Sequence, residues 1–246
     1  MIVEYDGSRY HGSQYQENAP TVQAELESAL GSLTAEVICI AAASRTDAGV
    51  HAEGQVISFL TDTRFPMETW VKGMNFYLSP DVAVKAAYEV PGSFDVRRHA
   101  LSRRYRYTVL NSRGRSPLKR RFTYLVPHAL NVAAMNCACD VLIGEHDFSP
   151  FASATGRRTE RRVLRAEWEV EEDVLAFYME ADSFLPHQVR NTVGALVRVG
   201  LGKMTVKDFG DILEAKKPGL AWPTAPAHGL CLMRVNYHHS WEELRN

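Results

Sequence analysis

This chain of 246 residues has little cysteine, no long apolar run and almost no net charge, and each shortage excludes a class of protein. Its four cysteines, Cys39, Cys137, Cys139 and Cys231, form no CxxC pair. They predict neither a disulfide framework nor a zinc site, and we expect reduced, mostly buried thiols in a cytoplasmic protein. No apolar run approaches the roughly 20 residues of a membrane span, and the first residues lack a signal-peptide pattern. We therefore expect no membrane partner.

The positive charges are unevenly distributed, although the formal net charge is only −1. Ten Lys or Arg and no Asp or Glu lie between Arg97 and Arg121. Five arginines and one acid, Glu160, lie between Arg157 and Arg165. These two segments hold more than half of the 28 basic residues, which favours a polyanion partner at one surface. The alternative is a solvated face whose charges are paired within the fold.

Apolar periodicity and turn residues predict a chain of strands with a few helices. The expected strands are 2–5, 36–43, 55–60, 81–90, 103–111, 163–171, 174–182 and 230–237, and the expected helices are 21–33, 66–77, 131–143, 187–199 and 205–215. Strands paired through short turns indicate an α+β fold with a mixed, largely antiparallel central sheet flanked by helices. We expect a boundary near residues 98–102 that separates domains 1–100 and 101–246, with an active cleft between them.

The stretch SRTDAGVHAEGQV, residues 44–56, places an arginine, an aspartate and a histidine in a polar loop between two apolar runs. A loop held at both ends by rigid elements is a common position for reactive groups. The plain structural alternative is an ordinary turn built with Asp47 and Gly49. Composition by itself does not separate the two interpretations.

Three kinds of chemistry could use this loop. A metal site built on Asp47, His51 and His11 would lack the second cluster of ligands that completes a coordination shell. Ser44 as a nucleophile would lack a glycine-rich elbow. Asp47 itself could be the nucleophile, and Arg45 would then help to keep its carboxylate ionised. We favour the third, in which a second cation would come from elsewhere in the fold.

The loop resembles the RTDAGVHA signature of the tRNA pseudouridine synthase A family, and six further segments resemble family motifs in the family's order. They are YDGSRYHG at 5–12, GMNFYLSPDVAV at 73–84, RRYRYTVLN at 103–111, GEHDFSPF at 144–151, FLPHQVRNTVGALVRVG at 184–200 and TAPAHGLCL at 224–232. The resemblance implies isomerisation of uridine to pseudouridine at positions 38, 39 and 40 of the tRNA anticodon stem-loop. It also implies a homodimer and a reaction without cofactor or metal.

The resemblance carries roles to individual residues. Asp47 matches the catalytic aspartate, and Tyr105 matches the tyrosine that lies against the target base. Arg190 matches the arginine that pairs with the catalytic carboxylate, and Arg45 one that helps to displace the base. With the resemblance, further basic residues are expected to contact RNA phosphates. They are Arg103, Arg104, Arg106, Arg157 and Arg158.

The chain also departs from the family pattern. Ser44 stands where the family usually has glycine, and the family's G-W-Q-R-Q loop reads GSQYQ here, with Ser13 and Tyr15 in place of tryptophan and arginine. These changes keep two alternatives open: a diverged synthase that acts on another RNA, and a non-catalytic RNA-binding paralogue. At the level of single residues, Arg190 could be a surface arginine and Tyr105 a core tyrosine.

Overall fold

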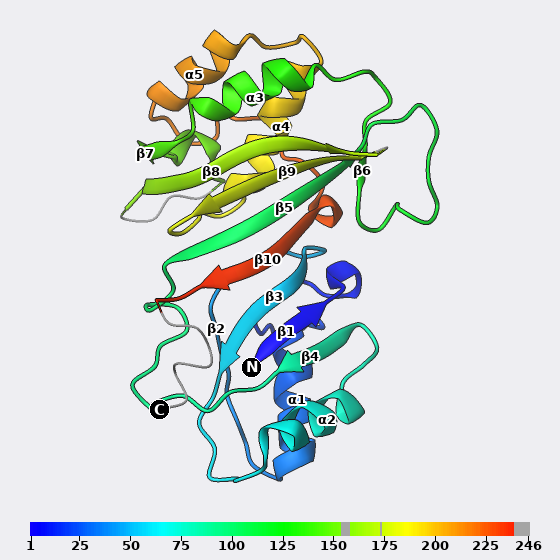
Figure 1. The fold of residues 1–246 in the computed structure, drawn as a ribbon, viewed down its shortest axis with the longest axis vertical. Coiled ribbons are helices and arrows are strands. Elements are labelled where there is room, and N and C mark those ends of the chain that lie inside the picture. The colour runs from blue at the N-terminus through cyan, green and yellow to red at the C-terminus, as the bar shows by residue number, and fades with distance from the viewer. Residues whose placement is uncertain (154–157, 173, 239–246) are drawn as a thin grey trace. The chain divides into compact units, whose positions relative to one another are not determined.

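The computed structural model describes residues 1–153, 158–172 and 174–238, which form two compact units (Figure 1). The first unit comprises Met1–Arg103 and the described residues from Leu232 onward, and the second comprises Arg104–Cys231. Ten strands and five α-helices occur in the described ranges, with antiparallel pairs predominating. The α+β class with a mixed, largely antiparallel sheet is therefore confirmed. The domain division and the cleft between domains stay predictions.

The sheet of the first unit is built around β1. This strand, Ile2–Tyr5, lies between β4 (Val82–Ala86) and β3 (His51–Ser58) and is antiparallel to both. The short strand β2 (Ala41–Ala42) also pairs with β3, and β10 (Leu230–Asn236) is the other neighbour of β3 in the sheet. The end of the chain thus returns to the unit with which it began.

Two helices of the first unit pack against each other. Helix α1 (Val22–Thr34) begins after Thr21, whose side chain accepts a hydrogen bond from a main-chain N–H of the first turn. Helix α2 (Met67–Tyr77) contacts α1 and β4. A Cβ atom at Gly73 would lie 2.6 Å from Cδ1 of Leu33, so the two helices approach closely because residue 73 has no side chain.

The predicted buried strand over residues 36–43 is wrong for most of its length, because only Ala41–Ala42 forms a strand. Val37 is fully exposed. The N–H of Ile40 donates to Oε1 of Glu27 on α1, at 3.0 Å, instead of joining a strand ladder. A side-chain carboxylate can satisfy a main-chain donor as a neighbouring strand does, and apolar composition does not reveal which one is used.

The second unit has its own antiparallel array of strands. In sheet order they are β5 (Ser102–Leu110), β9 (Val174–Ala181), β8 (Glu160–Glu171) and β7 (Gly144–Asp147). The short strand β6 (Tyr124–Leu125) runs parallel to β5. Strands β8 and β9 pair as the predicted hairpin, with Val163 paired to Ala181 and Glu171 to Val174.

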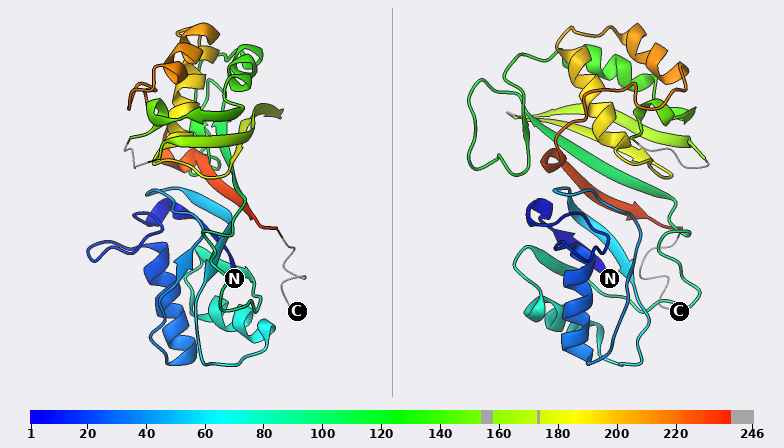
Figure 2. Two further views of the ribbon diagram at one scale, coloured as in Figure 1. Left: turned by 90° about the vertical axis from the view of Figure 1, so that its left-hand side faces the viewer. Right: turned by 180° about the vertical axis from the view of Figure 1, so that it is seen from behind.

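Three helices of the second unit gather beside β7 and β8 (Figures 1 and 2). They are α3 (Val132–Asp140), α4 (Gln188–Gly200) and α5 (Val206–Glu214), and short 3-10 turns occur at Gly7–Arg9, Ser149–Phe151 and Ala227–Gly229. Helix α4 is almost wholly buried, so it forms the centre of this helical layer. Within the described ranges, no helix has the length and hydropathy needed to cross a membrane.

The cysteines are free, but the expectation that most are buried is wrong. Cys139 is buried, Cys231 is half-buried, and Cys39 and Cys137 are exposed. Burial raises the pKa of the Cys139 thiol far above its usual value, which makes that thiol inert at neutral pH. The two exposed positions follow from irregular chain before β2 and from the outer face of α3.

Candidate active site

Asp47 begins a tight turn in the loop between β2 and β3. Its carbonyl accepts a hydrogen bond from the N–H of Val50 at 3.1 Å, and Gly49 takes a positive φ of 78°. A β-turn with a positive φ at its third residue favours glycine at that place. The Asp47 side chain is half-buried and that of Arg45 is exposed. The turn expected as the plain alternative is therefore present, and the candidate nucleophile occupies its first position.

Thr46, which precedes Asp47, is held from three directions. Its N–H donates to Oγ of Ser13 at 2.8 Å, and its carbonyl accepts from the N–H of Ser13 at 3.0 Å. Its own hydroxyl bonds to the Tyr5 hydroxyl at 2.8 Å. Thr46 and Ser13 are both buried, where hydrogen bonds of this kind persist. These contacts restrict the backbone directly beside Asp47.

Gln55 on β3 holds the start of the same loop. Its side-chain oxygen accepts the N–H of Ser44 at 3.2 Å, and its side-chain nitrogen donates to the carbonyl of Ser44 at 2.8 Å. Gln55 is only 1% exposed. Arg45 therefore lies between two anchored residues, Ser44 and Thr46, while its own side chain remains exposed. An exposed side chain on a fixed backbone suits contact with a bound molecule.

His51 connects this region to the first loop of the chain. It is 4% exposed, its Nδ1 accepts the N–H of Gly7 at 3.1 Å, and Oδ1 of Asp6 lies 3.2 Å away. A Cβ atom at Gly7 would lie 2.0 Å from the Val50 carbonyl oxygen. His51 thus holds two loops together, which is a structural role.

Tyr105 lies on β5 in the second unit, with 5% of its surface exposed. The ring of Phe184 packs edge-on against it, with 5.2 Å between ring centroids. Tyr107, which alternation places on the same face of the strand, donates from its hydroxyl to the carbonyl of Pro226 at 2.7 Å. Burial raises the pKa of Tyr107 far above its ordinary value, so its phenol stays protonated. The Tyr105 ring therefore lies buried beside Phe184, on a strand that is anchored at Tyr107.

Arg190 lies in the first turn of α4 and is oriented by the chain after α5. Its Nε donates to the carbonyl of Ala225 at 2.8 Å, and its own carbonyl accepts the Ala225 N–H at 3.1 Å. One turn further on, a Cβ atom at Gly194 would lie 1.6 Å from the carbonyl oxygen of Pro223. The absence of a side chain at residue 194 thus lets this segment lie directly on the helix.

The structure places the three predicted catalytic residues in different units. Asp47 and Arg45 share one loop of the first unit, whereas Tyr105 and Arg190 belong to the second. Their joint action in one site belongs to the proposal below.

Arg103 differs from the other predicted RNA contacts because it is buried. Its guanidinium donates to the carbonyls of Ala43 at 3.2 Å, Arg97 at 2.8 Å and Ala100 at 3.2 Å. These carbonyls satisfy N–H donors of the guanidinium, whose burial without partners would cost free energy. Ala43 opens the Asp47 loop, so Arg103 acts as an anchor for that loop, and we leave it out of the proposed RNA surface.

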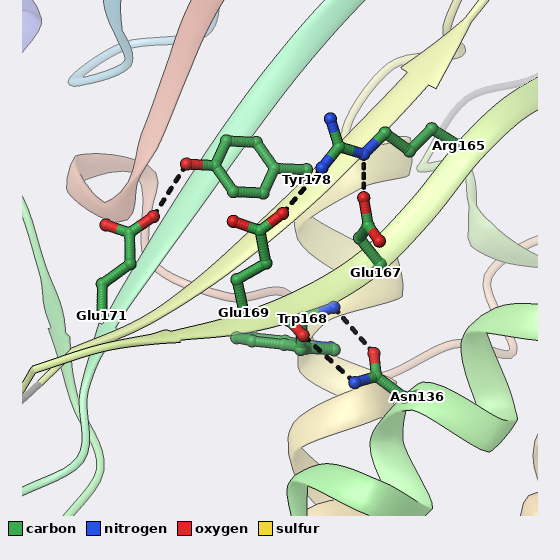
Figure 3. A network of polar contacts seen from close by, with 7 residues as sticks. All are labelled: Asn136, Arg165, Glu167, Trp168, Glu169, Glu171 and Tyr178. Carbon is green, nitrogen blue, oxygen red and sulfur yellow. Dashed lines mark hydrogen bonds and ion pairs between the residues drawn. The ribbon is translucent and has the colours of Figure 1, made fainter.

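Arg104 and Arg165 both approach the ring of Tyr178, at 4.9 and 5.1 Å from its centroid. Figure 3 shows that Arg165 also pairs with Glu167 and, at 2.7 Å, with Glu169. The basic segment that includes Arg165 is therefore partly neutralised by acids of its own strand. This agrees with the alternative of paired surface charges for that residue.

The remaining predicted contacts are less constrained. Arg106 is half-buried on β5, and Arg158 is exposed, with its guanidinium 3.8 Å from Glu145. Arg161 donates to the carbonyls of Arg158 and Glu160. Arg157 lies outside the described residues.

A pocket of about 600 Å³ lies in the first unit, away from the loop that carries Asp47 along β3. Its wall includes Val56, Phe59, Trp70 and Tyr88, and it contains none of the predicted catalytic residues. We assign it no role in the reaction. In the described part of the chain, no group of three or more His, Cys, Asp or Glu side chains could hold a metal ion.

Sequence reasoning missed the residues that position the site, above all Ser13, Gln55 and Gly194. In the sequence, Ser13 stands out only as a departure from a family motif. No short-range pattern marks a serine that bonds to a backbone 33 residues away. Such partners become apparent only when the loops are brought together.

Replacing Ser13 by alanine is expected to lower kcat about tenfold and the free energy of unfolding by about 1–3 kcal/mol. The reason is that the buried N–H of Thr46 loses its acceptor, which costs that much and loosens the chain beside Asp47. Ser13→Thr, which keeps the hydroxyl, should recover part of kcat. The control is Ser32→Ala on the exposed face of α1, which should change neither quantity appreciably. Unchanged kcat in Ser13→Ala would show that this contact does not position the loop.

Comparison with known proteins identifies the family of this chain. A family model described as tRNA pseudouridine synthase matches residues 1–97 and 138–238. The tRNA pseudouridine synthase A of Moorella thermoacetica is 44% identical over 241 residues, covering 96% of this chain and 98% of that protein. Those of Myxococcus xanthus and Acetivibrio thermocellus are 43% and 40% identical, covering 96% of this chain and 91% and 98% of those proteins. The chain therefore belongs to the tRNA pseudouridine synthase family.

Proposed function

We propose that this protein converts uridine to pseudouridine at positions 38, 39 and 40 of the tRNA anticodon stem-loop, with Asp47 as the nucleophile. Membership of the family makes the chain a tRNA pseudouridine synthase, which is an isomerase. The observation that carries the residue assignment is the loop itself: a half-buried aspartate at the first position of a turn whose neighbours are anchored. The finer assignment of RNA positions is supported by the sequence resemblance.

The proposed reaction begins when the target uridine leaves the base stack, which costs on the order of a few kcal/mol. Contact with an aromatic ring such as Tyr105 offsets about 1–3 kcal/mol of this cost. Because only 5% of Tyr105 is exposed, a neighbouring side chain has to move as the base enters. In this proposal Arg45, which is exposed in the Asp47 loop, occupies the position that the base leaves.

Asp47 then attacks the nucleotide, and attack on ribose C1′ or on base C6 leads to the same product. The bond between C1′ and N1 breaks, the uracil turns, and a bond forms between C1′ and C5. The bond from the Asp47 oxygen to the nucleotide breaks in the same sequence, so the free carboxylate is regenerated. The C5 proton passes to water and N1 gains a proton, so atoms and charge balance. In this proposal Arg190 supplies the cation that keeps the carboxylate ionised. No external oxidant, reductant or co-substrate is needed for this balance.

The C5 proton provides the direct test. A tRNA transcript labelled with tritium at uracil C5 should release tritium to water when the protein is added, with a chelator present. Absence of release with RNA still bound would favour a binding protein over an enzyme.

Mapping pseudouridine in RNA from a deletion strain tests the position. Loss at 38, 39 and 40 supports the proposal, whereas loss only at other sites would mean that the altered GSQYQ loop accompanies a different RNA target. No loss anywhere would support the non-catalytic paralogue. The homodimer implied by the resemblance and the cytoplasmic location expected from the cysteines stay predictions.

A further inference from the structure

We propose that residues 111–123, which connect β5 to β6, form a basic arm that binds the phosphate backbone of the RNA substrate away from the target uridine. This inference rests on the proposed function, because it names the part of the protein that holds the rest of that RNA. We refer to residues 111–123 as the basic arm.

The basic arm carries cations without nearby acids in the sequence. Its five basic residues lie within a stretch from Val96 to Cys139 that contains no Asp or Glu. They are Arg113, Arg115, Lys119, Arg120 and Arg121. All four arginines are exposed. Among the ion pairs of the described residues, none involves Arg113, Arg115 or Arg120. Their charge is therefore available to a partner.

Hydrogen bonds join the two ends of the arm, and others form a turn near its end. Figure 1 shows it as a long excursion that leaves the end of β5 and returns at β6. The side-chain amide of Asn111 donates to the carbonyls of Val126 and His128, at 2.9 and 2.7 Å, and so ties the two ends together. Further along, the carbonyl of Lys119 accepts from the N–H of Phe122 and the hydroxyl of Thr123, both at 2.9 Å. A loop restrained in this way presents its arginines at limited entropic cost.

The second basic segment, residues 157–165, is a weaker candidate for binding the RNA backbone. There, Arg165 pairs with two glutamates, Arg161 donates to main-chain carbonyls, and Arg158 lies near Glu145. Counterion release on RNA binding depends on cations that are not already neutralised. Arg113, Arg115 and Arg120 satisfy this condition, and guanidinium groups match phosphate geometry.

Because the arm follows the end of β5, it would contact phosphates that are remote from the target uridine. β5 ends at Leu110, five residues beyond Tyr105, which is about 17 Å of extended strand. A nucleotide held against Tyr105 therefore lies well away from the start of the arm. We thus expect the arm to affect the binding of RNA and not the chemical step.

The test replaces Arg113, Arg115 and Arg120 together by glutamine in the full chain. Binding of an unmodified tRNA transcript is measured at several salt concentrations, and tritium release is measured at saturating RNA. If each arginine meets one phosphate, the slope of log K against log salt becomes shallower by about 2–3. We expect Kd at low salt to rise at least tenfold and kcat at saturating RNA to stay within twofold. Thermal unfolding checks that the variant is folded.

The matched control replaces three exposed lysines that already face acids. Lys72 lies 3.9 Å from Glu68, Lys85 lies 2.9 Å from Glu4, and Lys207 lies 2.7 Å from Asp211. This triple glutamine variant should keep the wild-type slope. An arm variant with the same slope as wild type and control would overturn the inference. If wild type releases no tritium but the arm variant still has a shallower slope, the proposed reaction fails and the arm stands.

Discussion

Asp47→Asn is expected to lower the rate of pseudouridine formation by about a thousandfold or more, which corresponds to about 4 kcal/mol of transition-state stabilisation. The amide has nearly the shape of the carboxylate but cannot act as a nucleophile. The fold should be retained, because the loop is held through Thr46 and Ser44 and not through the carboxylate alone. The measurement is single-turnover tritium release, accompanied by tRNA binding.

Binding of tRNA by Asp47→Asn should be unchanged or slightly tighter, because the substitution removes a negative charge near a polyanion. The matched control is Asp62→Asn, which removes an exposed carboxylate from the loop after β3 and should keep the wild-type rate. Turnover by Asp47→Asn at the wild-type rate would exclude Asp47 as the nucleophile. Loss of both folding and binding would show that the carboxylate is structural.

Gly194→Ala is expected to lower the free energy of unfolding by about 3 kcal/mol or more, near or beyond the upper end for an overpacked core. The new Cβ would lie 1.6 Å from the Pro223 carbonyl oxygen and 2.9 Å from its carbonyl carbon. Both are main-chain atoms, so the segment has to move as a whole. Because the next residues of that segment orient Arg190 through Ala225, the rate of tritium release should also fall. The denaturant midpoint and the single-turnover rate test the two effects separately.

Gly210→Ala on α5 provides the comparison. Its Cβ would meet only Cγ1 of Val141, at 3.7 Å, an ordinary van der Waals contact. Alanine is favoured over glycine in a helix interior by about 0.8–1 kcal/mol, so this variant should be more stable than wild type. If Gly194→Ala were as stable as Gly210→Ala, the close approach of the 223–225 segment to α4 would be wrong.

Several helices were predictable because they carry local signals at their first turns. Thr21 caps α1, Pro66 precedes α2, and Thr205 forms a capping box with Asp208 on α5. These interactions join residues within one turn, so a linear pattern contains them. Strand boundaries were less predictable, as residues 36–40 show, because the partner of a strand is remote in sequence.

In the candidate site, too, some features can be predicted from neighbouring residues and others depend on the fold. The type of chemistry follows from residues that are adjacent in the chain, since Arg45 and Asp47 come from one loop. The hydrogen bonds that hold this loop do not follow from neighbouring residues, because Ser13 and Gln55 reach the loop through contacts between distant segments. Charge shows the same division: Arg103 and Arg113 belong to one acid-free stretch, yet one is buried against three carbonyls and the other is exposed.

By itself, the sequence determined the α+β class, most helices, the family and the identity of the candidate nucleophile, because periodicity, caps and motifs are local properties of the chain. Only the tertiary structure decided which polar groups are satisfied internally and which remain available. It made Ser13 a support of the Asp47 loop, made Arg103 an anchor, and left the arginines of the basic arm in solvent. The physical reason is that burial and hydrogen bonding depend on neighbours in space, and neighbours in space are set by the whole fold.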